Sequence, residues 1–155
     1  MKHLRTTAVD LVLGEQSTHE LPMLAAEALA RGVDSPTLRT LAGLSRTDAS
    51  RELFWQAMAE LGFPRPDPET AWHYRMRWAA QSLLRGDLSP YDASDEIYWC
   101  ASHLERSPHA TSVTDRFVGL QLAWEEQQGQ APAIEDEMRE AATALLRASP
   151  DAPRP

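Results

Sequence analysis

The feature that most constrains this chain is the spacing of its apolar residues, which is helical along almost its whole length. Apolar side chains recur every three or four residues, and no segment alternates apolar and polar residues as a half-buried strand does. The helical pattern covers residues 6–13, 20–31, 36–43, 48–61, 68–85, 90–106, 113–128 and 134–148. We therefore expect an all-α fold, a compact irregular bundle of about seven to eight helices.

Two near copies of one signal mark the ends of these segments. The stretches GVDSP, starting at Gly32, and GDLSP, starting at Gly86, each place a glycine where a helix can end in the left-handed conformation. Ser35 and Ser89 can then cap the next helix, and the proline after each serine suits its first position. The similarity does not extend over a whole structural unit, so we interpret it as helix punctuation and not as a repeat.

Length and composition predict one helical domain over residues 1–148, with the proline-rich connector 62–68 as a hinge and 149–155 as a disordered tail. No apolar run reaches the length of a membrane span, and no signal-peptide pattern opens the chain. Cys100 is the one cysteine, which excludes an internal disulfide and favours a reducing, cytoplasmic location.

Charge and missing motifs narrow the class of function. A net charge of −8 argues against broad nucleic-acid binding and favours a protein partner, in particular a basic one. The sequence contains no glycine-rich phosphate loop, nucleophile elbow or His-Glu-x-x-His motif, so it favours a non-enzymatic role without a cofactor. Neither the partner's identity nor the oligomeric state follows from these observations.

The segment 68–85 provides the first candidate site. Its apolar stripe faces one way, and the opposite side carries Tyr74, Trp78, Gln81 and Arg85. Arg75 and Arg77, with Arg85, make this segment markedly basic, and all six residues belong to the candidate site. Aromatic rings beside guanidinium groups are typical of protein-interaction hot spots and of carboxylate or phosphate sites. The alternative is a central helix buried on both sides, with its arginines paired to acids on neighbouring helices.

A second candidate site lies in LAGLSRTDASREL, residues 41–53, which resembles the helix-turn-helix of Lac-repressor-type regulators. The resemblance implies a DNA-binding transcriptional regulator in which a reading helix enters the major groove. Its DNA-contacting residues would be Ser45, Arg46, Ser50 and Arg51. The alternative is two packed helices joined by a short loop.

The spacing of Glu96, Cys100 and His103 makes these residues the third candidate site, because it puts three potential zinc ligands on neighbouring helical turns. Cys100 also belongs to the apolar stripe of that segment, which favours simple burial, and we expect no metal.

The whole chain resembles small uncharacterised all-helical proteins of GC-rich bacteria, a resemblance that implies no activity. The residues favour a non-enzymatic protein-interaction module, such as an adaptor, a regulator or an immunity-type inhibitor. Two alternatives stay open: the helix-turn-helix regulator, and a helical protein or enzyme that binds a small molecule near residues 72–85.

Overall fold

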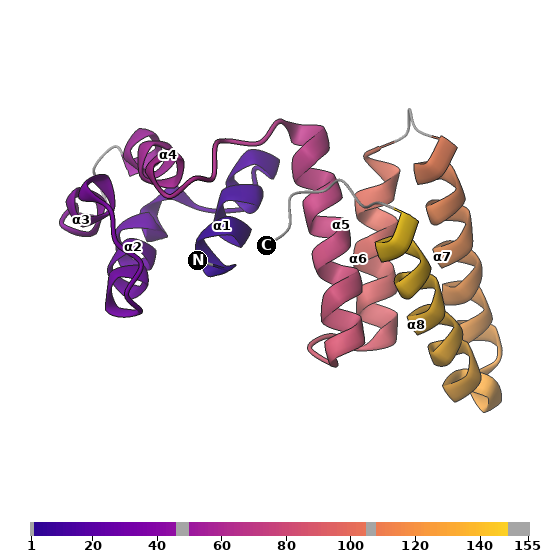
Figure 1. The fold of residues 1–155 in the computed structure, drawn as a ribbon. Helices are drawn as coiled ribbons and strands as arrows, with labels where there is room; N and C mark the ends of the chain where they lie inside the picture. The colour runs from indigo at the N-terminus through magenta and orange to yellow at the C-terminus, as the bar shows by residue number, and fades with distance from the viewer. Residues whose placement is uncertain (1, 46–49, 105–107, 149–155) are drawn as a thin grey trace. The chain divides into compact units, whose positions relative to one another are not determined.

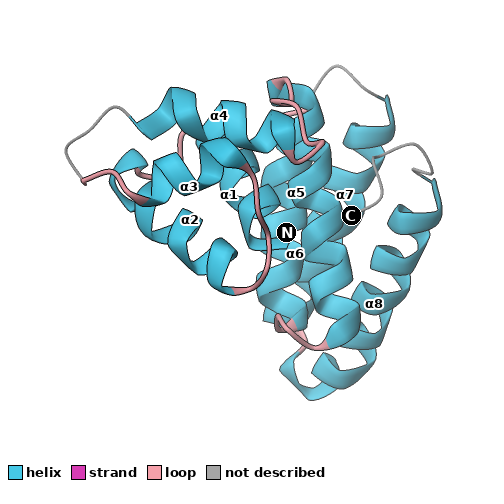
Figure 2. Ribbon diagram, turned by 60° about the vertical axis from the view of Figure 1, so that its left-hand side comes forward, coloured by secondary structure: helices cyan, strands magenta, loops and turns pink. Residues whose placement is uncertain are grey.

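The computed structural model describes residues 2–45, 50–104 and 108–148. Within these ranges the regular structure is entirely helical, which confirms the all-α fold class (Figures 1 and 2). Contacts divide the chain into two compact units, one ending at Ala71 and the other beginning at Trp72. This boundary lies just beyond the expected hinge at 62–68, and the single domain over 1–148 stays a prediction. The expected tail, 149–155, lies outside the described residues.

The first unit contains four α-helices and a short 3-10 turn. They are α1 (Lys2–Leu13), η1 (Thr18–Glu20), α2 (Leu21–Ala30), α3 (Pro36–Ala42) and α4 (Ser50–Glu60). Helix α1 begins at Lys2 and not at residue 6, because Leu4 is buried with Ala8 and Leu11 in the core of this unit. Phe54 and Met58 of α4 are fully buried in the same core.

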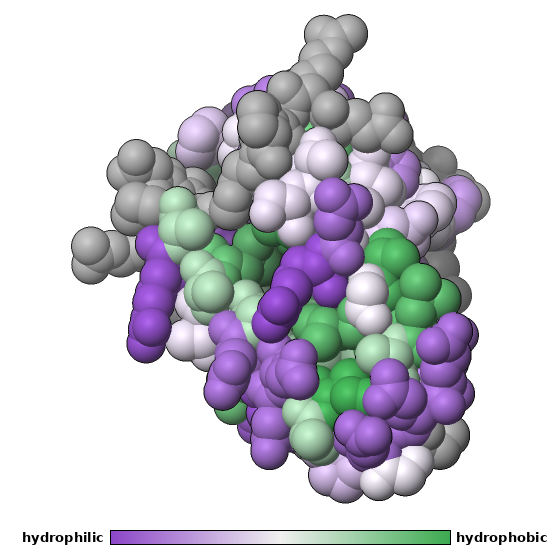
Figure 3. Space-filling view, turned by 90° about the vertical axis from the view of Figure 1, so that its right-hand side faces the viewer, coloured by the Kyte–Doolittle hydropathy of each residue, from purple (hydrophilic) through white to green (hydrophobic). Residues whose placement is uncertain are grey.

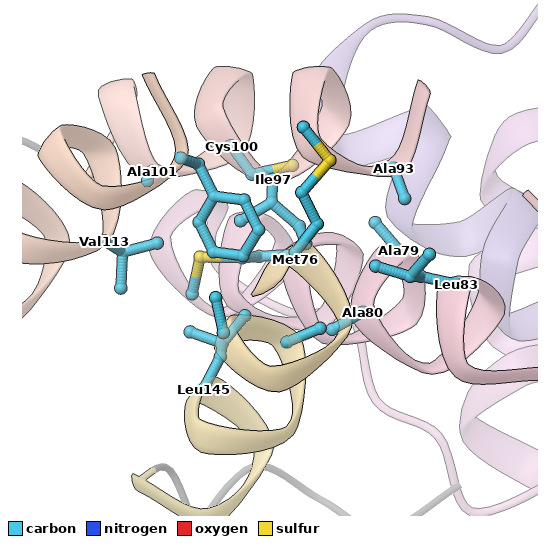
Figure 4. Close-up of a cluster of buried hydrophobic side chains, with 14 of the residues drawn as sticks. Met76, Ala79, Ala80, Leu83, Ala93, Ile97, Cys100, Ala101, Val113 and Leu145 are labelled. Atoms are coloured by element: carbon cyan, nitrogen blue, oxygen red, sulfur yellow. The ribbon is translucent and has the colours of Figure 1, made fainter. Parts of the chain in front are cut away.

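The second unit is a four-helix bundle in which successive helices run up and down (Figure 1). Its helices are α5 (Pro68–Arg85), which enters this unit at Trp72, α6 (Pro90–Ser102), α7 (Pro108–Glu126) and α8 (Ala131–Ala148), with the 3-10 turn η2 (Gln128–Gln130) before α8. The expected apolar stripes form its core, where Met76, Ile97 and Leu145 from three helices meet (Figure 4). Burial of such side chains contributes roughly 1.5–3 kcal/mol each before entropy is subtracted.

The helix punctuation inferred from sequence is confirmed. Gly32 and Gly86 have φ values of 82° and 77°, in the left-handed region. The hydroxyl of Ser35 accepts a hydrogen bond from the backbone N–H of Leu38 (3.1 Å), and Ser89 caps α6 in the same way. Each connector therefore stops one helix and starts the next through local chemistry.

Candidate functional site

The arginines of the first candidate site bond within the second unit. The guanidinium of Arg75 pairs with the carboxylate of Glu96 on α6. Arg77 Nη1 donates to the carbonyl of Leu146 on α8 (3.2 Å). Arg85 Nε donates to Asp87 Oδ2 (2.8 Å), just beyond the end of α5. Two of these three cations therefore tie α5 to neighbouring helices.

The other members of this face are half-buried. Tyr74, Trp78 and Gln81 are neither fully exposed nor fully buried, and Trp78 packs against the apolar core of the bundle. This arrangement is closer to the alternative, in which α5 packs against other parts of the bundle on both of its sides. A partner at these six residues stays a prediction.

The third candidate site is brought together only in part. Cys100 is fully buried, and its thiol donates to Glu96 Oε1 over 3.8 Å. His103 instead turns toward two tryptophans, and its Nδ1 lies 2.9 Å from the backbone carbonyl of Trp99. Among the residues that the structure describes, no group of three or more His, Cys, Asp or Glu side chains is arranged to hold a metal ion.

The contacts of His103 create a surface feature that the sequence did not predict. Its imidazole stacks on the indole of Trp72 from α5, with ring centroids 4.1 Å apart and planes inclined by 21°. The indole of Trp99 meets the same imidazole edge-on at 4.7 Å. We call Trp72, Trp99 and His103 the aromatic ledge. The one sequence signal for it was the i, i+4 spacing of Trp99, on α6, and His103, the residue just after α6.

The aromatic ledge is exposed and has a carboxylate beside it. Trp99 is 51% exposed, an unusual position for so large an apolar side chain. Asp95 lies one helical turn before Trp99, is exposed, and accepts a long hydrogen bond from Gln121 Nε2 (3.5 Å). A carbonyl can only accept, so His103 Nδ1 is the donor to Trp99, and the imidazole is held in place by both this bond and its stacking.

A groove between α7 and α8 is a second surface feature of the bundle. Its volume is about 430 Å³, within the range of ligand and peptide sites. It is lined by Ser112, Val113, Arg116, Phe117, Glu140, Ala141, Ala144, Leu145 and Ala148. Figure 3 views this side of the molecule and shows hydrophobic side chains between hydrophilic ones. We call it the α7–α8 groove.

The residues of the helix-turn-helix candidate lie in the first unit. Ser50 is 3% exposed, and its hydroxyl donates to the carbonyl of Thr18 (2.8 Å). Arg51 donates to the carbonyl of Leu11 (3.4 Å). Ser45 is exposed, whereas Arg46 lies outside the described residues. Ser50 and Arg51 thus bond to other parts of their own unit, and their role in DNA binding stays a prediction.

In comparisons with known proteins, no family model, curated protein or solved structure matches the chain. Within the described ranges, no helix is both long enough and apolar enough to span a membrane.

Proposed function

We propose that this chain is a non-enzymatic protein-interaction module, such as an adaptor, a regulator or an immunity-type inhibitor, and that it binds its partner through the aromatic ledge. The observation that supports this proposal is the exposed indole of Trp99, held against His103, which itself stacks on Trp72. Tryptophan is the residue most enriched in interface hot spots.

The aromatic ledge suits binding because it is ordered before a partner arrives. Trp99 is packed against an imidazole that has a hydrogen bond and a stacking partner of its own. An anchor whose rotamer is already restricted loses less conformational entropy on binding, a cost of about 0.5–1.5 kcal/mol for a flexible side chain. More of the contact energy then appears as affinity.

The charge around the aromatic ledge favours a basic partner. Asp95 presents a carboxylate one turn from the face of Trp99, and the chain as a whole carries a net charge of −8. An arginine or lysine from a partner can lie over the indole and pair with Asp95, a cation–π contact of about 0.5–2 kcal/mol depending on how far it is desolvated. The net charge would also accelerate association with such a partner.

We place the module in the cytoplasm and assign it no cofactor. Cys100 supports this location, because it is a buried free thiol, typical of proteins in a reducing compartment. The acidic charge supports a protein rather than a nucleic acid as the partner.

The test compares Trp99→Ala with Leu122→Ala. Leu122, on α7, is 53% exposed and serves as a matched loss of apolar surface outside the aromatic ledge. A partner captured by the wild-type chain should bind Trp99→Ala about tenfold more weakly or worse, and should bind Leu122→Ala normally. Asp95→Asn should weaken binding as well, and the loss should shrink at high salt.

Equal binding by the wild type and Trp99→Ala would remove the aromatic ledge from the proposal. Titration calorimetry with the purified partner gives the affinities directly, and circular dichroism of each variant shows that the helices are retained.

A further inference from the structure

We infer that the α7–α8 groove is a self-association surface, and that its occupant is the same groove of a second copy of this chain. This inference does not depend on the aromatic ledge, which is formed by α5 and the C-terminal end of α6. It rests on two opposite charges that face the groove from its two walls.

Arg116 projects from α7 and Glu140 from α8, and both are exposed. Among the described residues, neither side chain has a hydrogen bond or an ion pair, with each other or with a third residue. The other arginine of this pair of helices that lies in mid-helix, Arg139, is bonded to Glu135 and Asp136. Arg116 and Glu140 are therefore opposite charges on one groove, each available to a further group.

Such a groove is complementary to itself. In a two-fold dimer the same patch faces its own copy, so a contact from residue i to residue j is made twice. When α7 of one copy lies against α8 of the other, each Arg116 meets the carboxylate of the second copy's Glu140. A uniformly basic partner, by contrast, would match Glu140 but be repelled by Arg116.

The walls also allow close approach. Ala144 and Ala148, on the α8 wall, are exposed and have short side chains. Small residues on facing helices let a second pair of helices pack near the apolar floor formed by Val113, Phe117 and Leu145. Salt screens the repulsion between charges of the two copies that lie farther apart than a Debye length, about 8–10 Å, so acidic groups far from the groove oppose the dimer only weakly.

The experiment measures the mass of the full chain in solution by sedimentation equilibrium. The wild type should approach twice the monomer mass of 17.3 kDa as its concentration rises. Arg116→Glu and Glu140→Arg should each weaken self-association at least about tenfold, because every reversal is felt at both symmetric contacts. Glu126→Arg, a reversal on α7 outside the groove, is the matched control and should leave the mass unchanged.

The most specific test is to mix the two charge-reversal variants. Arg116→Glu and Glu140→Arg should each be monomeric alone but should pair with each other, since the mixed dimer regains two favourable contacts. The double variant should also regain self-association. Circular dichroism confirms that these exposed substitutions leave the helices intact.

The inference would be overturned by a wild type that stays monomeric at every concentration, by a dimer that neither reversal weakens, or by failure of the mixture to pair. A dimer that appears only after removal of residues 149–155 would make that segment the occupant and would overturn it too. Trp99→Ala should not change the mass, which separates this result from the fate of the proposed function.

Discussion

Thr37, at the start of α3, donates both its backbone N–H (3.1 Å) and its hydroxyl to the carboxylate of Glu60, at the end of α4. A side chain from one helix thus satisfies a free backbone donor at the beginning of another. The hydroxyl of Thr37, helped by Ser35 and by the backbone N–H, lowers the pKa of Glu60 below its ordinary value of 4.5.

This linkage predicts a pH dependence of stability. The pKa of Glu60 is lower in the folded chain, so the carboxylate stabilises the fold fully above its unfolded pKa, and this contribution is lost as the pH falls through the folded pKa. In urea unfolding, Glu60→Gln should therefore destabilise the chain at neutral pH and lose less stability than the wild type on acidification. Glu52→Gln, on the exposed side of α4, should behave like the wild type. Parallel pH curves for Glu60→Gln and the wild type would contradict this prediction.

Opposite effects are expected at two glycines. Gly86 has a positive φ, so Gly86→Ala should cost about 1–2 kcal/mol in the free energy of unfolding. Gly119 lies within α7 with open space around its Cα, so Gly119→Ala should stabilise by about 0.5–1 kcal/mol. Chemical denaturation of the two variants checks both signs, and stabilisation by Gly86→Ala would refute the helix-ending role of that residue.

The ion pair between Arg75 and Glu96 predicts a pattern in a double-mutant cycle. Both side chains are less than a quarter exposed, and Glu96 also accepts from the buried thiol of Cys100. Arg75→Leu should cost about 1–3 kcal/mol, because it leaves a carboxylate without its cation. Adding Glu96→Leu should recover most of that loss. If the two single effects simply add, the pair contributes no coupling.

A buried methionine reports on the core of the bundle. Met76 is 1% exposed and lies among Ile97, Cys100 and Leu145 (Figure 4). Met76→Ala should destabilise by about 2–5 kcal/mol, since it leaves a cavity, whereas Met76→Leu should cost less than about 1.5 kcal/mol. Thermal and urea unfolding measure both. Equal effects of the two variants would argue against close packing at this position.

The sequence predicted the helix ends that depend on interactions between residues close together in the chain. Gly32 and Ser35 act on neighbours a few residues away, so their roles are readable from a short window. The predicted start of the helix at residue 113 was wrong. Helix α7 begins at Pro108, because this proline starts the helix instead of breaking it.

The apolar spacing along the sequence could not predict which side chains of different helices meet. The spacing along α5 identified its outer face, but it gave no means of knowing that Arg77 would reach the carbonyl of Leu146. The stacking of Trp72 on His103 likewise depends on which helices are neighbours, so the aromatic ledge went unpredicted. Similarity to a DNA-binding motif described the residue types around Ser50 but not the burial of its hydroxyl.

The up-and-down order of the second unit has a kinetic consequence. Helices that follow each other in the chain, α6 with α7 and α7 with α8, are in close contact, and α6 contacts α8 to a smaller extent. Joining them closes only short loops, so little chain entropy is lost before native contacts form, and bundles of this kind fold in microseconds to milliseconds. Helices α6 and α7 can therefore pair as soon as both are synthesised, whereas the core closes only when α8 brings Leu145 beside Met76 and Leu146 within reach of Arg77.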